Sequence, residues 1–232
     1  MIKHERDQAF DTGQLTREEQ SAAPLSRRER NKQEKRRRIV AAARRLFATK
    51  GFAQTTTQEI AEEADIGAGT LFLYAKSKED LLVMVFKDEM IETSRAAFDK
   101  AELSAPLIDQ LMSVFGAMVA YHDRDLELSR TLLKEVLFPA APERVEDIKD
   151  LMRIIYHRMG DLVDAKRQSE GLRSDVNPRV AAETMFSVYL MVLLTWLRGE
   201  ITQSQFNERL RARLSITVDG LRRETPKQAA RP

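Results

Sequence analysis

The chain of 232 residues is 43% hydrophobic and 32% charged, with only nine glycines and seven prolines, a balance typical of a globular helical protein. It contains no cysteine, which excludes disulfides, thiolate metal sites and cysteine nucleophiles and leads us to expect the reducing cytoplasm. The net charge is +2, but residues 27–38 hold eight Lys or Arg against two acids, which suggests a polyanionic partner or, alternatively, a solvated tail.

The amino-terminal residues 1–26 carry few apolar side chains and no sustained periodicity, so we expect disorder there. We assign residues 1–30 to a disordered basic extension. This extension lacks the apolar core of a signal peptide, and the most apolar stretch of the chain, residues 186–197, is too short to span a bilayer. We therefore predict no membrane segment and no membrane partner.

The first two helices are marked by their caps. One helix begins within the basic block and ends at Gly51, a left-handed cap, and Phe52 is expected to fold back onto Phe47. A second helix opens at Thr56, where Glu59 has the spacing of a capping box. A short turn and a third helix are expected to follow.

Residues 65–67 are predicted to form that turn, and residues 68–74 the third helix. Ser77 and Asp80 then have the spacing of a second capping box, which starts a long fourth helix that links the head to the rest of the chain. Residues 31–80 are thus predicted to be a three-helix helix-turn-helix head.

From Pro106 onward every segment has the periodicity of a helix, and no strand alternation is present. We expect an all-α fold in which residues 81–225 form a helical ligand-binding and dimerisation domain and residues 226–232 a flexible tail. The dipeptide Asn177–Pro178 is a strong start signal for a helix that runs to Arg198.

This helix is apolar nearly all round, so it needs cover on more than one side, which its own domain and a second copy of the chain could both provide. Burial inside a monomer is the rival interpretation. This helix and the last helix are together predicted to form the homodimer interface. The predicted interface residues are Val188, Val192, Trp196, Phe206, Leu210, Leu214 and Val218.

Residues 57–82, TQEIAEEADIGAGTLFLYAKSKEDLL, closely resemble the DNA-binding signature of the tetracycline-repressor (TetR) family. The resemblance covers residues 38–82, and the rest of the chain is similar only in its length and run of helices. It implies a homodimer whose third helices enter the major groove about 34 to 36 Å apart on a palindromic operator. Carried over by position, the DNA-facing residues are Thr57, Gln58, Ala68, Gly69, Thr70, Phe72, Tyr74 and Lys78.

The chain departs from the family pattern at four positions. Asp65 replaces the usual turn glycine and Gly67 the usual serine cap, and both substitutes suit those conformations. Phe72 replaces a tyrosine and loses a phosphate-binding hydroxyl. Ala75 replaces an aromatic residue and leaves space in the small core, which we expect Leu73 to fill.

The DNA-facing residues divide by chemistry into those that bind phosphates and those that reach bases. The start of the second helix and Lys78 present amides, a hydroxyl and an ammonium to phosphates. Gln58 and Thr70 are the only polar side chains placed to reach base edges, so we predict modest specificity with a contribution from DNA shape. The basic block is predicted to follow the backbone or the minor groove as an arm, through Arg36, Arg37 and Arg38.

Methionine and aromatic side chains recur on core-facing stripes of the body. Because methionine is adaptable, this lining suits a pocket for a largely apolar or aromatic effector, with ordinary packing as the alternative. The candidate lining residues are Met112, Phe115, Met118, His122, Met152, Tyr156, Met159, Met185 and Tyr189, of which His122, Tyr156 and Tyr189 could supply a polar contact. No His lies in a zinc-type spacing and no catalytic or phosphate-binding motif is present, so we expect no metal, no cofactor and no enzyme.

The sequence thus predicts a ligand-responsive repressor that binds a palindromic operator as a homodimer and leaves DNA when ligand changes the spacing of its heads. Two alternatives stay open. A constitutive dimeric regulator without an effector would have a filled core in place of a pocket. A helical protein-binding adaptor would show no salt-sensitive affinity for duplex DNA.

Overall fold

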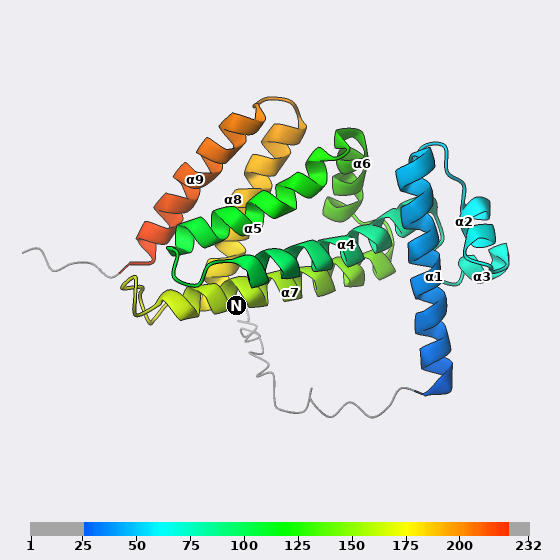
Figure 1. The fold of residues 1–232 in the computed structure, drawn as a ribbon, viewed down its shortest axis with the longest axis horizontal. Coiled ribbons are helices and arrows are strands. Elements are labelled where there is room, and N and C mark those ends of the chain that lie inside the picture. The colour runs from blue at the N-terminus through cyan, green and yellow to red at the C-terminus, as the bar shows by residue number, and fades with distance from the viewer. Residues whose placement is uncertain (1–25, 223–232) are drawn as a thin grey trace, which may run out of the picture.

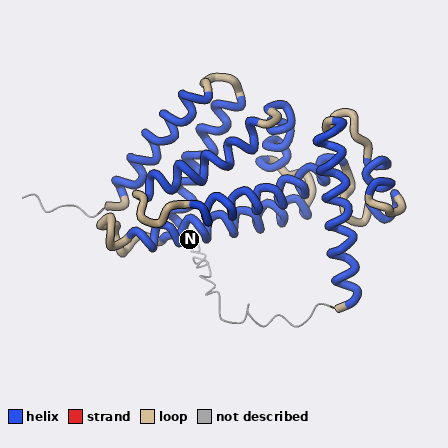
Figure 2. Tube along the Cα trace, viewed as in Figure 1, coloured by secondary structure: helices blue, strands red, loops and turns tan. Residues whose placement is uncertain are grey.

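The computed structural model describes residues 26–222, and within that range it is all-α, as predicted, with nine helices (Figure 1). The disorder expected for residues 1–25 and the tail expected for residues 226–232 lie outside the described residues. The helices are α1 (Arg27–Lys50), α2 (Thr57–Glu63), α3 (Ala68–Leu71), α4 (Lys78–Lys100), α5 (Leu107–Asp123), α6 (Leu126–Leu137), α7 (Pro142–Lys166), α8 (Pro178–Leu197) and α9 (Gln203–Gly220). Figure 2 shows that loops alone connect them.

Helix α1 starts earlier than the predicted boundary of the amino-terminal extension. Ser26 accepts a hydrogen bond from the Glu29 amide at 3.2 Å, and the Glu29 carboxylate accepts one from the Ser26 amide at 3.0 Å. This capping box satisfies free amides at the helix start, so residues 27–30 are helical, which corrects the disorder predicted up to residue 30. At the other end Gly51 has φ of +85°, and the rings of Phe47 and Phe52 lie 5.2 Å apart, as expected.

Helices α1, α2 and α3 form a head with a small core of its own. Ile39, Ile60 and Leu71 come from the three helices and are fully buried. Ala61 is also buried, and its short side chain lets the helices cross closely. The head is therefore a compact three-helix unit, and Figure 1 shows it at one end of the molecule.

Helix α4 joins the head to the body. Figure 1 shows it running from the head along α5 and α7, and it also packs against α1 and α6. Residues 81–86 are all buried, so this part of α4 is covered on every side. The head and the body therefore share one helix as part of both of their cores.

The start of α4 is tied to the body by an ion-pair cluster. The predicted capping box is present: Asp80 accepts hydrogen bonds from the Ser77 amide at 3.0 Å and from the Lys76 amide at 2.7 Å. Arg144 of α7 donates to the other Asp80 carboxylate oxygen and to Glu135 of α6, and at 3.1 Å to the Ser77 hydroxyl. The Arg144 and Asp80 side chains are only 10% and 11% exposed. One arginine thus connects α4, α6 and α7.

A second link between α4 and α7 lies further along both helices. The ammonium of Lys87 contacts Asp147 at 2.7 Å and Asp150 at 3.0 Å. The Lys87 hydrogen bond is the main cause that lowers the pKa of Asp150. Sliding of α4 along α7 would therefore break both links, of which the Arg144 cluster is the more deeply buried.

Replacement of Arg144 by methionine tests how much the buried cluster contributes to the stability of the fold. Arg144→Met leaves Asp80 and Glu135 without a cation in a largely covered site, so we expect the free energy of unfolding in urea to fall by about 3 kcal/mol. Arg153→Met on the same helix removes a pair with Asp150 whose side chains are 60% and 49% exposed, and should cost less than about 0.5 kcal/mol. Equal losses for the two variants would show that the cluster does not hold α4.

Candidate nucleic-acid interface

The turn between α2 and α3 has the geometry that a helix-turn-helix requires. Asp65 has φ of +52°, so it occupies the left-handed position predicted for it. Thr56 and Glu59 form the predicted capping box at the start of α2. Hydrogen bonds from Lys50 and then from Thr56 lower the pKa of Glu59 to about 2, which keeps this cap charged. Gly67 caps α3 with its backbone alone.

Helix α3 ends at Leu71, three residues before the predicted end at Tyr74, and residues 72–74 form a turn. Leu73 is 78% exposed and points away from the head core. The prediction that Leu73 fills the space beside Ala75 is therefore wrong. Ala75 is itself 3% exposed, so the core closes around the small residue.

All the residues predicted to contact DNA lie at the surface of the head or partly so. Gln58, Gly69 and Phe72 are exposed, and none of the others is buried. The half-buried ones are Thr57, Ala68, Thr70, Tyr74 and Lys78. These residues are therefore accessible to a partner, as a major-groove reader requires, and direct DNA contact by them stays a prediction.

Two of these side chains already have partners inside the head. The Gln58 amide donates to Glu62 at 2.8 Å, so reading a base costs it this bond. Lys78 donates to the carbonyl oxygens of Phe52 at 2.7 Å and Ala53 at 3.2 Å, and lies 4.5 Å from the centre of the Phe52 ring. Lys78 therefore joins the start of α4 to the loop that follows α1, in addition to any phosphate contact.

The three arginines predicted as a DNA-binding arm lie on a helix. Arg38 donates to the Ala64 carbonyl at 2.9 Å and to the Asp65 carboxylate at 3.0 Å, which joins α1 to the turn. Arg36 contacts Asp88 of α4 at 3.3 Å. Arg37 is exposed and pairs with Glu34 on the same helix at 2.6 Å. All three therefore have partners in the structure, and Arg36 and Arg38 join α1 to other elements.

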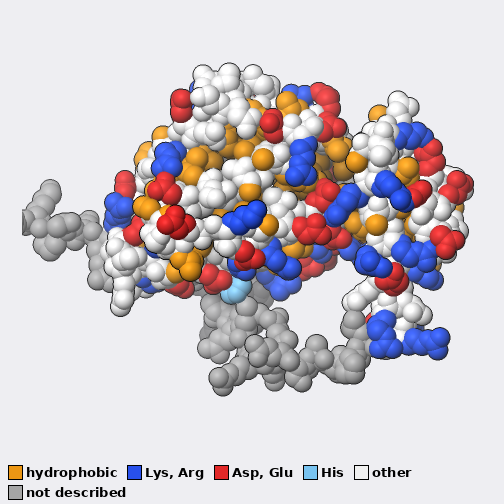
Figure 3. Space-filling view, viewed as in Figure 1, with side chains coloured by type: hydrophobic (Ala, Val, Ile, Leu, Met, Phe, Trp, Pro, Cys, Tyr) orange, Lys and Arg blue, Asp and Glu red, His pale blue; other side chains and the backbone are white. Residues whose placement is uncertain are grey.

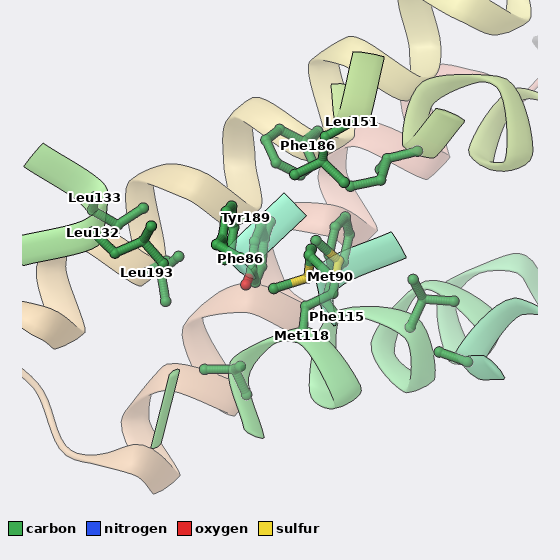
Figure 4. Close-up of a cluster of buried hydrophobic side chains, with 14 of the residues drawn as sticks. Phe86, Met90, Phe115, Met118, Leu132, Leu133, Leu151, Phe186, Tyr189 and Leu193 are labelled. Atoms are coloured by element: carbon green, nitrogen blue, oxygen red, sulfur yellow. The ribbon is translucent and has the colours of Figure 1, made fainter. Parts of the chain in front are cut away.

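The residues predicted to bind an effector gather in the core of the body. Phe115 of α5 and Tyr189 of α8 stack with ring centres 4.5 Å apart and planes 8° apart. Figure 4 shows this pair in one cluster with Met90 and Met118. The remaining predicted lining residues are His122, Met159 and Met185, which are buried, and Met112, Met152 and Tyr156, which are half-buried. The predicted effector residues thus belong to one hydrophobic core or pack against it.

Tyr189 has an unusual position within this cluster. Its side chain is fully buried, and its hydroxyl has no hydrogen-bond partner among the described residues. Burial raises the pKa of Tyr189, so the phenol stays neutral. A buried hydroxyl without a partner costs about 1 to 3 kcal/mol. A ligand with an acceptor atom would recover that energy.

A separate cavity of about 330 Å³ lies between the head and the body. Its polar wall includes Arg44, Glu89, Tyr121 and Arg124, with Tyr121 donating to Glu89 at 2.8 Å. The apolar wall is formed by Phe47, Leu82, Val85, Leu128 and Leu132. None of the predicted effector residues lines this cavity, and no signal in the sequence pointed to it, because its walls come from α1, α4, α5 and α6.

His122 is buried in the core, and its partner Ser129 lines this cavity. The Ser129 hydroxyl donates to the His122 carbonyl at 3.1 Å and lies 3.2 Å from Nδ1, so it can accept from Nδ1–H. Burial lowers the pKa of His122 to about 4. The imidazole is therefore neutral near neutral pH and acts as a packed, hydrogen-bonded side chain.

The residues predicted as the dimer interface are mostly covered within one chain. Only Val188 is half-buried, while the others are buried in the core: Val192, Trp196, Phe206, Leu210, Leu214 and Val218. The apolar stripe of α9 packs on α8, with the Trp196 and Phe206 rings 6.0 Å apart. A partner cannot reach the six buried side chains, so the predicted contact face is corrected for them: they belong to the intrachain core.

The opposite face of α8 is uncovered and carries two apolar side chains. Val180 is 55% and Met191 58% exposed, and Ile216 of α9 is 75% exposed. Helix α8 is 20 residues long and apolar enough to cross a membrane by length and composition alone, so the apolar stretch extends beyond the predicted residues 186–197. Half of this apolar segment is buried inside the protein, as in a core helix. Its outer face stays exposed in the single chain.

Within residues 26–222 no group of His, Asp and Glu side chains could hold a metal ion. The acidic side chains near the candidate sites instead pair with cations or cap helices, as Glu89 does with Arg44 at 3.2 Å.

Residues 39–85 match the family described as bacterial regulatory proteins, tetR family. The fatty acid metabolism regulator protein of Bacillus subtilis (strain 168) is 23% identical over 159 residues, which are 67% of this chain and 79% of that protein. The matched family segment runs from α1 into α4, so it includes the whole helix-turn-helix.

Among solved structures, Thermus thermophilus FadR, a TetR family repressor in complex with lauroyl-CoA, has the same fold with a TM-score of 0.65 and 24% identity. The likeness covers 84% of this chain and 100% of that one. FadR from Bacillus subtilis in complex with stearoyl-CoA has a TM-score of 0.58 at 21% identity, over 79% of this chain and 97% of that one. The shared fold thus includes the body as well as the head.

The low pKa of His122 gives a pH dependence that can be measured. The unfolded chain takes up the proton below about pH 6.5 while the folded chain does not until about pH 4, so stability is complete above this window and falls as pH decreases through it. Between about pH 7 and pH 5 we expect His122 to account for a loss of about 2 kcal/mol in the free energy of unfolding.

His122→Gln, which removes the titrating group, should lose this part of the pH dependence in urea unfolding. His157→Gln is the matched control, because His157 is exposed. The account of His122 is wrong if the two variants and the unaltered protein show the same difference between the two pH values.

Proposed function

We propose that this chain, a transcriptional regulator of the TetR family and not an enzyme, is a cytoplasmic repressor that leaves its palindromic operator on binding a long-chain acyl-CoA thioester. The observation that carries this proposal is the whole-chain likeness to two FadR proteins, one in complex with lauroyl-CoA and one with stearoyl-CoA. The likeness includes the body, where an effector would bind, and not only the DNA-binding head.

The core of the body suits an acyl chain. Its methionines are flexible and can repack around an apolar chain without the loss of a polar contact. Met90 and Met118 are buried near the aromatic pair of Phe115 and Tyr189 (Figure 4), and Met185 is buried on α8 one turn before Tyr189. The unpartnered Tyr189 hydroxyl would gain an acceptor from the carbonyl oxygen of the thioester. We therefore place the acyl chain between α4, α5 and α8.

The position of this core explains how the effector would act on the head. An effector shifts an equilibrium only by the difference between its affinities for the two states. An acyl chain beside Met90 must displace α4, and residues 81–86 of the same helix are enclosed between head and body. The head orientation that the acyl chain favours would then differ from the one that fits DNA.

The homodimer is proposed to form through the outer face of α8 and the neighbouring face of α9. Val180, Met191 and Ile216 leave apolar surface uncovered there. The smaller Thr184 and Ser187 lie between the two α8 residues along the helix and leave room for a second copy of α8. A two-fold contact of this kind sets the spacing of the two heads.

A constitutive regulator is the second candidate, and one observation favours it: the predicted effector residues are packed, with Phe115 stacked on Tyr189. The helical adaptor is set aside, because the chain is a transcriptional regulator. The choice between the responsive and the constitutive repressor is a matter of whether the core opens for a ligand.

Release of DNA by acyl-CoA tests the proposal. Operator fragments are first selected from a genomic pool with the purified protein, and lauroyl-CoA or stearoyl-CoA is then added to the complex. We expect release by both acyl-CoA thioesters and none by free CoA, because the acyl chain fills the core. A complex that persists with both thioesters would favour the constitutive regulator.

The variant Tyr189→Phe sharpens this assay, because the two expected effects differ in sign. Removal of the unpartnered hydroxyl should raise the free energy of unfolding by about 1 kcal/mol without ligand and weaken acyl-CoA binding by about tenfold. The control Tyr156→Phe changes a half-buried tyrosine of α7, outside the site proposed between α4, α5 and α8, and should change neither quantity by much. Unaltered acyl-CoA affinity in Tyr189→Phe would remove Tyr189 from the site.

The proposed dimer face is tested by Met191→Glu. A carboxylate on the centre of an apolar contact would be buried without a partner, so we expect sedimentation to give monomers at micromolar concentration and DNA affinity to fall. Leu103→Glu, at a loop residue that is 78% exposed, is the control and should stay dimeric. A dimeric Met191→Glu protein would place the interface elsewhere.

A further inference from the structure

The amino-terminal part of α1 is a helix that stands clear of the protein core. Residues 27–38, called the basic segment here, extend over about 17 Å at the rise of an α-helix. Residues 27–35 are all exposed, and the first buried residue of α1 is Ile39. The segment is nevertheless held in helical form by the Ser26–Glu29 capping box. A rigid element thus projects where an unstructured arm was predicted.

Three cations on one face of the basic segment have no partner in the part of the chain that the structure describes. Arg28, Lys32 and Lys35 have the spacing i, i+4, i+7, which places them on one face. Within residues 26–222 they make no ion pair and no side-chain hydrogen bond, unlike Arg36, Arg37 and Arg38 of the same segment. Their charge is therefore available to a partner.

This face forms one wall of an open groove of about 760 Å³. The same wall includes Arg27 and Asn31. The opposite wall is formed by Leu73 and Tyr74, which directly follow the third helix. No carboxylate lines the groove. This groove of the protein therefore begins at the end of α3, the helix predicted to enter the DNA major groove. Figure 3 shows basic side chains gathered at this end of α1.

The arrangement carries a local electrostatic cost. Like charges at i and i+4, such as Arg28 and Lys32, destabilise a helix, and cations near its amino terminus oppose the helix dipole. A row of phosphates would remove both penalties. The distance from Arg28 to Lys35 along the helix is about 11 Å, enough to meet about two phosphates of one strand.

We propose that the groove between the basic segment and Leu73–Tyr74 is a second DNA-binding surface, which holds the phosphates of one strand outside the base pairs read by α3. Its occupant is duplex DNA that flanks each half-site, because the groove is continuous with the reading surface. It supplies affinity and no base readout. The proposal rests on the DNA binding of the proposed function and extends the contact outward along the duplex.

The test removes charge from the groove and leaves the helix-turn-helix untouched. The triple variant Arg28→Gln, Lys32→Gln, Lys35→Gln is compared with a control of equal charge change at exposed sites elsewhere, Lys100→Gln, Lys134→Gln, Arg209→Gln. Affinity is measured against salt concentration for a minimal operator and for one with long flanks. Circular dichroism and thermal unfolding check that each variant is folded.

With long flanks we expect the groove variant to lose at least tenfold in affinity, and its log–log salt slope to fall by about 2 to 3 per subunit. On the minimal operator it should bind like the unaltered protein. Hydroxyl-radical footprinting should show that it protects the half-sites and no longer the flanks. The control should keep slope and footprint.

An unchanged salt slope and footprint in the groove variant would overturn this inference while DNA binding itself stands. Absence of duplex binding by the unaltered protein would instead overturn the proposed function. A loss that is equal with and without flanks would also overturn the inference, because it would place these cations on the operator core.

Discussion

The burial of α4 on every side is the constraint on which the rest of the structure depends. Residues 81–86 belong at once to the core of the head and to that of the body, so neither half can rearrange without this helix. Arg144 fixes its start to α6 and α7, and Lys87 fixes its middle to α7. A ligand bound in the body core, as proposed, would therefore act on the head through a rigid, laterally held helix rather than through a flexible linker.

Local signals in the sequence were sufficient for the head and for most helix starts. The capping boxes at Thr56 and Ser77, the left-handed Asp65 and the Asn177–Pro178 start depend only on neighbouring residues, and the structure contains all of them. The all-α class followed from periodicity for the same reason. Hydrogen bonds within three or four residues can be read from the chain directly.

Features that depend on long-range packing could not be predicted in this way. Periodicity identifies an apolar stripe but not whether its cover is the same chain or a second copy, so the Phe206 stripe was assigned to the dimer and belongs to the core. Leu73 was expected inside and lies outside, because α3 ends early. The partners of Arg144 are up to 67 residues away in sequence, and no pattern connects them.

We propose above all that acyl-CoA binding in the body changes the separation of the two heads through α4. The chain has no cysteine, so Gln54→Cys gives a single label site on an exposed residue of the head. The distance between the labels of a dimer is then measured by double electron–electron resonance. We expect one distance on operator DNA and a different one with stearoyl-CoA, whereas an unchanged distance in protein that has bound stearoyl-CoA would contradict the account.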